Sequence, residues 1–270
     1  MTFVDVHAHL IHPQFEGEER EAAERARQAG LGAVIVNGLE PSSNRRVLEL
    51  CDEYDHLYPA LGIYPVDAIA QRISPENWPY DWPPPTAFDV DQEIAFIESV
   101  APRLIAIGEC GLDRYWVKDE DAEQERVLRA LIEIAMRHDK PVILHTRKAE
   151  ARTLEILLEM GVTKADFHCF TGKLKLAHRI ADAGYYLSIP PAVVRDQTFQ
   201  RFAKELPLES LLTETDSPYM GPVRGERNEP AYVPRGVEAL AQARGLTAEA
   251  MKRAIAENFE RLFGVSAQSS

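Results

Sequence analysis

The stretch that decides the fold is Leu104-Ile105-Ala106-Ile107-Gly108-Glu109-Cys110-Gly111-Leu112-Asp113. Its first four residues form a short apolar run with the length expected of a buried parallel strand. The run stops at a glycine, and Glu109 follows directly. A carboxylate at the carboxyl end of a buried strand is costly unless a cation or a hydrogen-bond donor meets it. The stretch therefore predicts a strand that carries an acidic ligand to one rim of a sheet.

Four other apolar runs end in the same way, in a histidine or an aspartate. Residues 3–6 lead directly into His7-Ala8-His9, and strand geometry sends both of these imidazoles to one face. The remaining candidates follow later runs: His145 after residues 141–144, His168 after residues 165–167 and Asp216 shortly after residues 211–213. This repetition predicts a metal centre at one rim, with Glu109 in its middle.

Short predicted strands alternate with predicted helices along the whole chain. The expected strands are residues 3–6, 33–36, 57–61, 104–107, 141–144, 165–167, 185–189 and 211–213. The expected helices are residues 18–28, 41–55, 91–100, 119–138, 150–160, 174–183, 234–243 and 248–263. This pattern predicts one (β/α)₈ barrel domain over residues 1–270. A doubly wound sheet is the alternative, but only a closed ring brings the ends of the first and eighth strands together.

The least regular part of the chain is residues 69–89. It holds five prolines and two of the three tryptophans, Trp78 and Trp82. Because so many prolines are incompatible with a helix or a central strand, we expect a long loop on the rim where helices follow strands. Such a loop either shapes a pocket or an interface, or packs its own tryptophans on the surface.

Composition narrows the class of protein. Hydrophobic residues make up 45% of the chain, which is enough for a full core. No apolar run approaches the length of a membrane span, and no signal-peptide pattern opens the chain, so we expect a cytoplasmic protein without membrane contact. The net charge of −13 argues against a broad nucleic-acid surface, but not against a nuclease that binds phosphate through metals and a few local arginines.

The six candidate ligands exceed what one tetrahedral ion needs. A nitrogen-rich set suits zinc or manganese better than a pure magnesium site, although the sequence leaves zinc, manganese and magnesium open. Because a glutamate can bridge two ions through its two oxygens, we expect two divalent ions. One division places His7, His9, Glu109 and Asp216 on the first ion, and Glu109, His145 and His168 on the second. Each of these residues could by itself have a purely structural role, as an aspartate in a turn does. Their shared position at strand ends favours metal binding.

Six segments together resemble the TatD family. They are His7-Ala8-His9, the stretch from Gly108 to Asp113, His145-Thr146-Arg147, His168-Cys169-Phe170, Thr215-Asp216-Ser217-Pro218-Tyr219 and Arg227-Asn228-Glu229-Pro230. The similarity runs from Val4 to about Leu262. It implies a (β/α)₈ metal-dependent hydrolase of the amidohydrolase type, with the six ligands carried over and Asp216 also serving as general base. Members of this family include deoxyribonucleases, and some relatives cleave D-aminoacyl-tRNA esters.

Two segments depart from the family pattern. The third strand is followed by Gly62-Ile63-Tyr64-Pro65, where the family usually has a histidine before the proline. Tyr64 therefore joins Asp216 and Glu109 as a catalytic candidate. After Asp113 the chain continues Arg114-Tyr115-Trp116 instead of Tyr-Tyr-Arg, so Arg114 could supply the family's cation from a displaced position.

These observations favour metal-dependent hydrolysis of phosphodiesters, with DNA as the substrate. Arg114, Arg147 and Arg227 are the candidate phosphate-binding residues. The alternative is a hydrolase of carboxylic esters or amides on the same site, for which Tyr64 and the loop tryptophans would shape an apolar pocket. A metal-binding protein without turnover is the third possibility. Nothing in the sequence indicates an obligate protein partner.

Overall fold

The computed structural model describes residues 2–267. Within them, eight parallel strands form one sheet in the sequential order β1 to β8. The strands are β1 (Phe3–Ala8), β2 (Leu31–Asn37), β3 (Leu57–Leu61), β4 (Ala106–Asp113), β5 (Val142–Arg147), β6 (Ala165–Phe167), β7 (Tyr186–Ile189) and β8 (Leu211–Thr213). Their apolar side chains are buried almost completely, as expected for a sheet covered by helices.

Strands β1 and β8 meet and close the sheet into a ring. Thr213 Oγ1 donates a hydrogen bond to the carbonyl oxygen of Val4 at 2.7 Å. Beyond the strand, the amide of Asp216 donates to the carbonyl of His7 at 2.8 Å, and the amide of His9 donates to Ser217 at 2.9 Å. The predicted (β/α)₈ barrel is therefore confirmed, and the doubly wound sheet is excluded.

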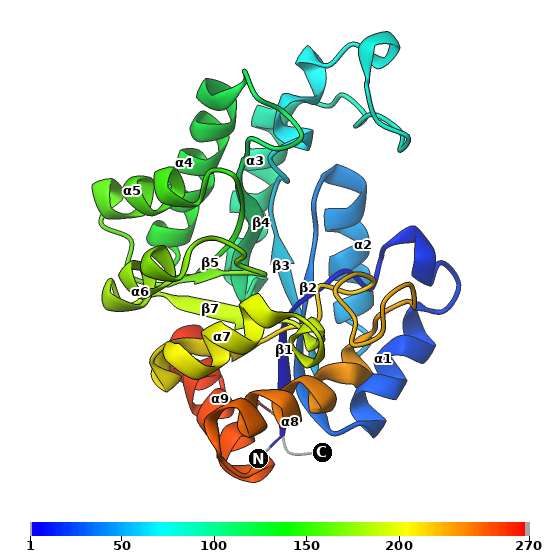
Figure 1. Cartoon of the computed structure of the whole chain (residues 1–270). Helices are drawn as coiled ribbons and strands as arrows, with labels where there is room; N and C mark the ends of the chain where they lie inside the picture. The colour runs from blue at the N-terminus through cyan, green and yellow to red at the C-terminus, as the bar shows by residue number, and fades with distance from the viewer. Residues whose placement is uncertain (1, 268–270) are drawn as a thin grey trace.

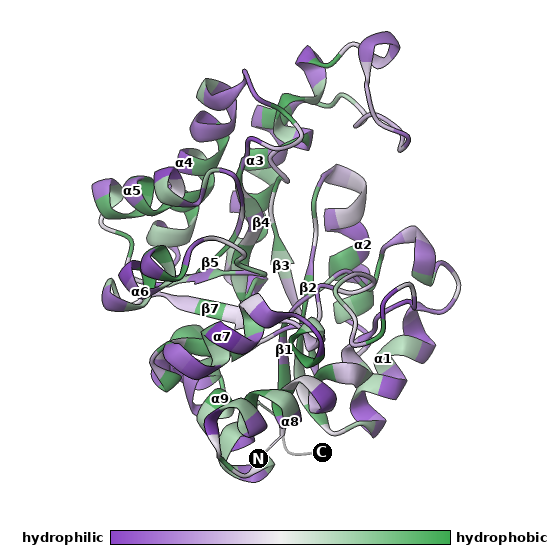
Figure 2. Cartoon of the chain, in the orientation of Figure 1, coloured by the Kyte–Doolittle hydropathy of each residue, from purple (hydrophilic) through white to green (hydrophobic). Residues whose placement is uncertain are grey.

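Helices surround the ring (Figure 1). Those of the described chain are α1 (Glu19–Gln28), α2 (Pro41–Cys51), α3 (Val90–Val100), α4 (Asp121–Arg137), α5 (Glu150–Met160), α6 (Leu174–Asp182), α7 (Gln197–Glu205), α8 (Val233–Arg244) and α9 (Ala248–Phe263). Figure 2 shows that the helices carry mixed faces, with hydrophobic residues toward the strands and hydrophilic residues outward. This amphipathic pattern is what predicted most of them.

Helix α7 was not predicted from the sequence. Asp196 caps its first turn, since its side chain accepts a hydrogen bond from the amide of Thr198 at 2.8 Å. Phe199, Phe202 and Ala203 then form the buried stripe. The cap and the spacing of the two phenylalanines were the available signals. The helix has only nine residues, so its periodic pattern is short.

Strand β4 is longer than the sequence analysis expected. The prediction ended the strand at Ile107, but β4 runs to Asp113, so Glu109 lies inside the strand instead of beyond it. Gly108 and Gly111 have φ angles of +155° and +154°, and pairing with β5 shifts register between Ile107 and Cys110. The strand therefore bends at its glycines and continues. The sequence, in contrast, predicts a strand that stops at the first glycine.

The segment between β3 and α3 contains two short 3₁₀ turns, Asp67–Arg72 and Pro75–Asn77. The rest is irregular, as the prolines predicted, and in Figure 1 the segment projects from the body of the molecule. The indole nitrogen of Trp78 donates to the carbonyl of Trp82 at 2.8 Å. The loop thus packs its own tryptophans, which was one of the two expectations.

Over residues 2–267, none of the helices combines the length with the apolar composition that a membrane span requires.

Candidate metal centre

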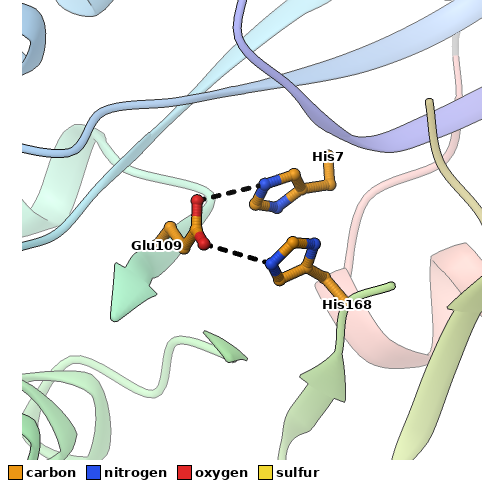
Figure 3. A group of neighbouring side chains, drawn as sticks. All are labelled: His7, Glu109 and His168. Carbon is orange, nitrogen blue, oxygen red and sulfur yellow. Dashed lines mark hydrogen bonds and ion pairs between the residues drawn. The ribbon is translucent and has the colours of Figure 1, made fainter. Parts of the chain in front are cut away.

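The six predicted ligands converge at the carboxyl end of the barrel, around Glu109. Its Oε2 lies 3.3 Å from the Nε2 atoms of both His7 and His9. Its Oε1 lies 2.9 Å from His145 Nδ1 and 3.1 Å from His168 Nε2. Figure 3 shows how His7 and His168 approach the two different carboxylate oxygens. The glutamate therefore stands between two pairs of imidazoles.

Asp216 completes the cluster from the segment after β8. Its Oδ1 lies 3.9 Å from His7 Nε2 and 3.7 Å from His9 Nε2. Its side chain is 16% exposed, whereas that of Glu109 is 4% exposed. Of the two carboxylates, Asp216 is thus the one more open to solvent and to a substrate.

The electrostatics of the cluster are dominated by burial and by the charge of Glu109. Burial alone would raise the pKa of Glu109, but the neighbouring imidazoles of His168, His145 and His7 bring it well below its usual value. Burial lowers the pKa of His168, yet the carboxylates of Glu109 and Glu214 outweigh it and raise that pKa well above normal. The cluster therefore keeps an anionic centre, and three of the four surrounding imidazoles, those of His9, His145 and His168, have raised pKa values.

Two of the four histidines, His145 and His9, have a hydrogen-bond acceptor on their second ring nitrogen, and a carboxylate lies farther from that of His168. His145 Nε2 lies 3.0 Å from Asp113 Oδ2, and His9 Nδ1 lies 3.1 Å from the carbonyl oxygen of Asn37. His168 Nδ1 lies 3.7 Å from Glu214 Oε2. Metal-binding histidines characteristically donate their second ring N–H to such a partner, which orients the ring.

His7 differs from the other three histidines in the direction in which its pKa is shifted. Like that of His168, its Nδ1 is buried and has no hydrogen-bond partner within the described chain. Burial and the neighbouring His168 lower the pKa of His7 well below its ordinary value, so the ring is neutral. The two rings stack with centroids 3.8 Å apart. A neutral imidazole is the form that ligates a metal.

A second group of carboxyls lies beneath the site. Ser188 Oγ is 2.7 Å from Asp166 Oδ2 and 2.6 Å from Glu214 Oε2. A hydroxyl donates only one hydrogen bond, so one of these carboxyls must carry a proton and donate to the serine. Burial raises the pKa of Glu214 to about 8 and that of Asp166 to about 6. The signal in the sequence was the position of Glu214, two residues before Asp216.

The donor set fits divalent metal ions. Two groups of side chains have their candidate donor atoms within 4.8 Å of one another: His7 with Glu109 and His168, and His7 with His9 and Asp216. The Nε2 atoms of His7 and His9 are only 3.0 Å apart and face the same carboxylate oxygen. Imidazole nitrogens and carboxylate oxygens around one point are ligands of zinc and related ions. The buried cluster thus suits a metal site.

Tyr64 lies beside this cluster. Its hydroxyl donates to Asp113 Oδ2 at 3.4 Å, and its ring meets that of His145 edge-on, with centroids 4.8 Å apart. Burial, together with the charges of Asp113 and Glu109, raises the pKa of Tyr64 well above its normal value of 10. The phenol is therefore a neutral hydrogen-bond donor near neutral pH.

The three candidate phosphate-binding arginines lie in different environments. Arg114 forms an ion pair with Asp121 at 2.7 Å, and Arg227 forms one with Glu18 at 2.7 Å. Over the part of the chain that the structure describes, Arg147 has no carboxylate partner. Its guanidinium lies instead over aromatic rings. Arg147 is thus the one of the three whose charge is not already compensated.

A histidine–carboxylate cluster at the carboxyl end of a (β/α)₈ barrel defines the class of this protein, which is that of the metal-dependent hydrolases. The chain belongs to the family of TatD-related DNases, since the family model with that description matches residues 4–264. This confirms the resemblance that the sequence motifs indicated.

Individual relatives agree with this membership. The chain is 35% identical to the human protein named deoxyribonuclease TATDN3, over 96% of this chain and 94% of the relative. It is 32% identical to the metal-dependent hydrolase YabD of Bacillus subtilis, over 97% of this chain and 99% of the relative. The crystal structure of the TatD homologue YjjV from Escherichia coli superposes with a TM-score of 0.83 at 30% identity, covering 97% of this chain and 98% of the other.

Proposed function

We propose that this protein hydrolyses phosphodiester bonds in DNA by means of two divalent ions. The observation that carries the proposal is the position of Glu109, whose two carboxylate oxygens each face a different pair of imidazoles. A bridging carboxylate between two sets of nitrogen ligands is the arrangement that a binuclear site needs. The name of the human relative, a deoxyribonuclease, supports DNA as the substrate.

In this proposal the ligands divide as the sequence suggested. His7, His9, Asp216 and Glu109 would hold the first ion, and Glu109, His145 and His168 would hold the second. When bound, such ions lower the pKa of a water and stabilise charge on the attacking and leaving oxygens. Zinc and manganese match the nitrogen-rich set best.

The other roles fall to the chain's own side chains. Asp216, the more exposed carboxylate, accepts the proton of the attacking water. The phenol of Tyr64 is neutral near pH 7 because its pKa is raised, and it can exchange its long hydrogen bond to Asp113 for one that it donates to a phosphate oxygen. Arg147 attracts the phosphate, because no carboxylate of the described chain neutralises it.

Hydrolysis of a carboxylic ester or amide is the second candidate. The same activated water would attack a carbonyl carbon, and the aromatic side chains near Arg147 would favour an apolar substrate. The two candidates differ in the charge they require beside the metal centre. A phosphodiester needs the positive charge of Arg147, whereas an uncharged ester does not.

Metal analysis combined with a panel of substrates tests the proposal. We expect two ions per chain and cleavage of an oligodeoxynucleotide and of bis(p-nitrophenyl) phosphate, with little cleavage of p-nitrophenyl acetate. Glu109→Gln should lower the metal content and remove the activity. The control is Glu98→Gln, which changes a partly exposed glutamate in the last turn of α3 that is paired with Arg137. One ion per chain in both the wild type and Glu109→Gln would contradict the binuclear site.

A further inference from the structure

A cluster of five aromatic side chains lies beside the candidate metal centre. Its members, called the aromatic platform below, are Trp78, Tyr80, Trp82, Tyr115 and Trp116. The first three come from the proline-rich loop before α3, and the last two come from the turn that follows β4. Their centroids are 4.6–5.8 Å apart, so the two loops form one aromatic surface. All three tryptophans of the chain belong to it.

Two of the five side chains, Trp78 and Tyr80, use their polar group in a hydrogen bond within the platform. Trp78 Nε1 donates to the carbonyl of Trp82, and the hydroxyl of Tyr80 donates to the carbonyl of Trp116, both at 2.8 Å. The outer rings nevertheless remain open, because Trp82 is 37% exposed and Tyr115 is 44% exposed. An open pocket lined by Trp78, Tyr80 and Trp116 adjoins these rings. The platform thus offers the ring faces of Trp82 and Tyr115 to a ligand.

Arg147 places a positive charge on this aromatic surface. Its guanidinium carbon lies 3.9 Å from the centroid of Tyr115 and 4.8 Å from that of Trp116. Within residues 2–267 the guanidinium forms no ion pair. Arg147 follows His145 by two residues on β5, so both side chains leave the same face of the strand, roughly 6–7 Å apart along it.

Asp113 links the platform to the metal centre. Its Oδ1 accepts hydrogen bonds from the amides of Tyr115 and Trp116, both at 2.8 Å. Its Oδ2 contacts His145 Nε2 at 3.0 Å and the hydroxyl of Tyr64 at 3.4 Å. One buried carboxylate therefore fixes the turn that carries two platform rings and also a histidine of the candidate site.

We infer that the aromatic platform and Arg147 form a nucleobase-stacking subsite beside the metal centre. Its ligand is one unpaired nucleotide of a single-stranded DNA end, whose base stacks on the ring of Tyr115 or Trp82 while its phosphate faces Arg147. The inference rests on the proposed function. Stacking requires an unpaired base, because a paired base in a duplex already has neighbours on both faces.

The surrounding charges restrict this subsite to a short segment of DNA. Arg72, at the base of the loop, is paired with Glu120 at 2.8 Å and with Glu123 at 3.0 Å. Arg114 is paired with Asp121 at 2.7 Å. These two arginines are therefore compensated, whereas Lys118, which lines the same pocket, forms no ion pair with the described residues. Because few free cations remain beside Arg147, the subsite should hold only a short segment, and binding should depend modestly on salt.

Tryptophan fluorescence reports on this surface directly, since every tryptophan of the chain lies in it. A short oligodeoxythymidylate, added to the protein in EDTA so that no cleavage occurs, should quench the fluorescence in a saturable way. Tyr115→Leu and Trp82→Leu should each weaken binding by roughly 5- to 100-fold, the range found for removal of one base-stacking ring. Tyr115→Phe and Trp82→Phe should bind like the wild type, because they keep a ring.

A control variant is Tyr54→Leu, at the opposite end of the barrel, where α2 leads into β3. It should bind the oligonucleotide like the wild type. Circular dichroism of each variant shows whether the fold is retained. If the leucine variants at positions 82 and 115 are folded and bind as tightly as their phenylalanine counterparts, the platform is not a stacking subsite.

Cleavage assays separate this inference from the proposed function. An oligonucleotide built from abasic tetrahydrofuran units has the same phosphodiesters but no ring to stack, so Trp82→Leu should cleave it with unchanged kcat/KM while losing kcat/KM on the oligodeoxythymidylate. Equal losses on the two substrates would overturn the subsite and leave the phosphodiesterase in place. A wild-type protein that cleaves neither substrate would contradict the proposed function, and the fluorescence titration would still test the platform.

Discussion

Glu109 contacts four imidazoles with two oxygens, and this is why its replacement should affect both halves of the cluster. Removing one member of a buried ion pair leaves the other charge buried without a partner. The loss of folding stability is then larger than the net stabilisation that the ion pair provides. The same argument does not apply to Asp216. That residue is 3.7–3.9 Å from its two nearest imidazoles and lies closer to solvent.

Asp216→Asn tests the role of general base. An amide has nearly the same shape but does not accept a proton, so we expect turnover to fall by about 10²- to 10⁴-fold with most of the metal retained. The measurements are kcat on one phosphodiester and the metal content of the same sample. Asp52→Asn is the control, because Asp52 pairs with Arg103 at the far end of α2. Wild-type turnover in the Asp216 variant would remove Asp216 from the chemistry.

Tyr64 is the residue at which this chain departs from its family's pattern. An imidazole shuttles protons near pH 7, whereas the buried phenol of Tyr64 does not, because its pKa is raised well above 10. Tyr64→His should therefore raise the turnover number, and Tyr64→Phe should mainly raise KM. The comparison requires a single substrate and equal metal occupancy. A slower histidine variant together with an unchanged phenylalanine variant would place Tyr64 outside the reaction.

Strand β4 is the element that positions the site, and it does so through its glycines. A Cβ added to Gly111 would lie 1.9 Å from the carbonyl oxygen of His145 on β5. The φ angle of +154° at Gly111 is also unfavourable for any other residue. The close approach of β4 to β5 therefore depends on the absence of a side chain at this position.

Gly111→Ala should consequently destabilise the protein by about 2–4 kcal/mol and reduce metal binding, because β5 must move and take His145 with it. The control is Gly161→Ala at the end of α5, where φ is +70° but nothing lies within 4 Å of the added Cβ. That variant should cost only about 1–2 kcal/mol and keep the metal. Chemical unfolding and metal analysis measure both effects. Equal behaviour of the two variants would contradict the role of Gly111.

The barrel as a whole joins residues from both ends of the chain in one site. His7 and Asp216 are adjacent only because β1 and β8 close the ring. Any ion that binds this site must therefore stabilise the closed barrel against unfolding. At a metal concentration of about 100 times Kd the gain is roughly 2.7 kcal/mol. For a domain near this size, each kcal/mol raises Tm by about 2–4 °C.

The difference in Tm between metal-loaded and EDTA-treated protein should grow from pH 6 to pH 8. Against the opposing effect of burial, Asp113 and Glu109 raise the pKa of His145, and Glu109 raises that of His168. In the metal-free protein these raised pKa values contribute stability that is complete below about pH 6.5 and is lost as pH rises through the folded-state values. Metal binding must displace the same protons, so the affinity for metal increases over that range.

Thermal unfolding at pH 6, 7 and 8 measures this difference. His178→Gln on α6, away from the cluster, should leave the pH dependence unchanged, whereas Glu109→Gln should abolish the metal-induced shift. A shift that is constant with pH would show that these histidines do not exchange protons for metal.

The order of the elements and the positions of the six candidate ligands followed from the sequence, because both depend on local pattern. Apolar runs of strand length alternate with amphipathic stretches, and parallel strands of a barrel place all their carboxyl ends at one rim. A histidine or an acid after several such runs must therefore face its counterparts. Local pattern was less informative at Gly108, where we expected β4 to stop and it continues.

The environment of each ligand was decided by the tertiary structure alone. The division of Glu109 between two imidazole pairs and the support of His145 by Asp113 depend on how β4 lies against β5. Arg227, which the sequence analysis named as a phosphate-binding candidate, forms an ion pair with Glu18, 209 residues away in the chain. Contacts between distant residues depend on the packing of the whole ring. The hydrophobic periodicity of a single segment therefore does not predict them.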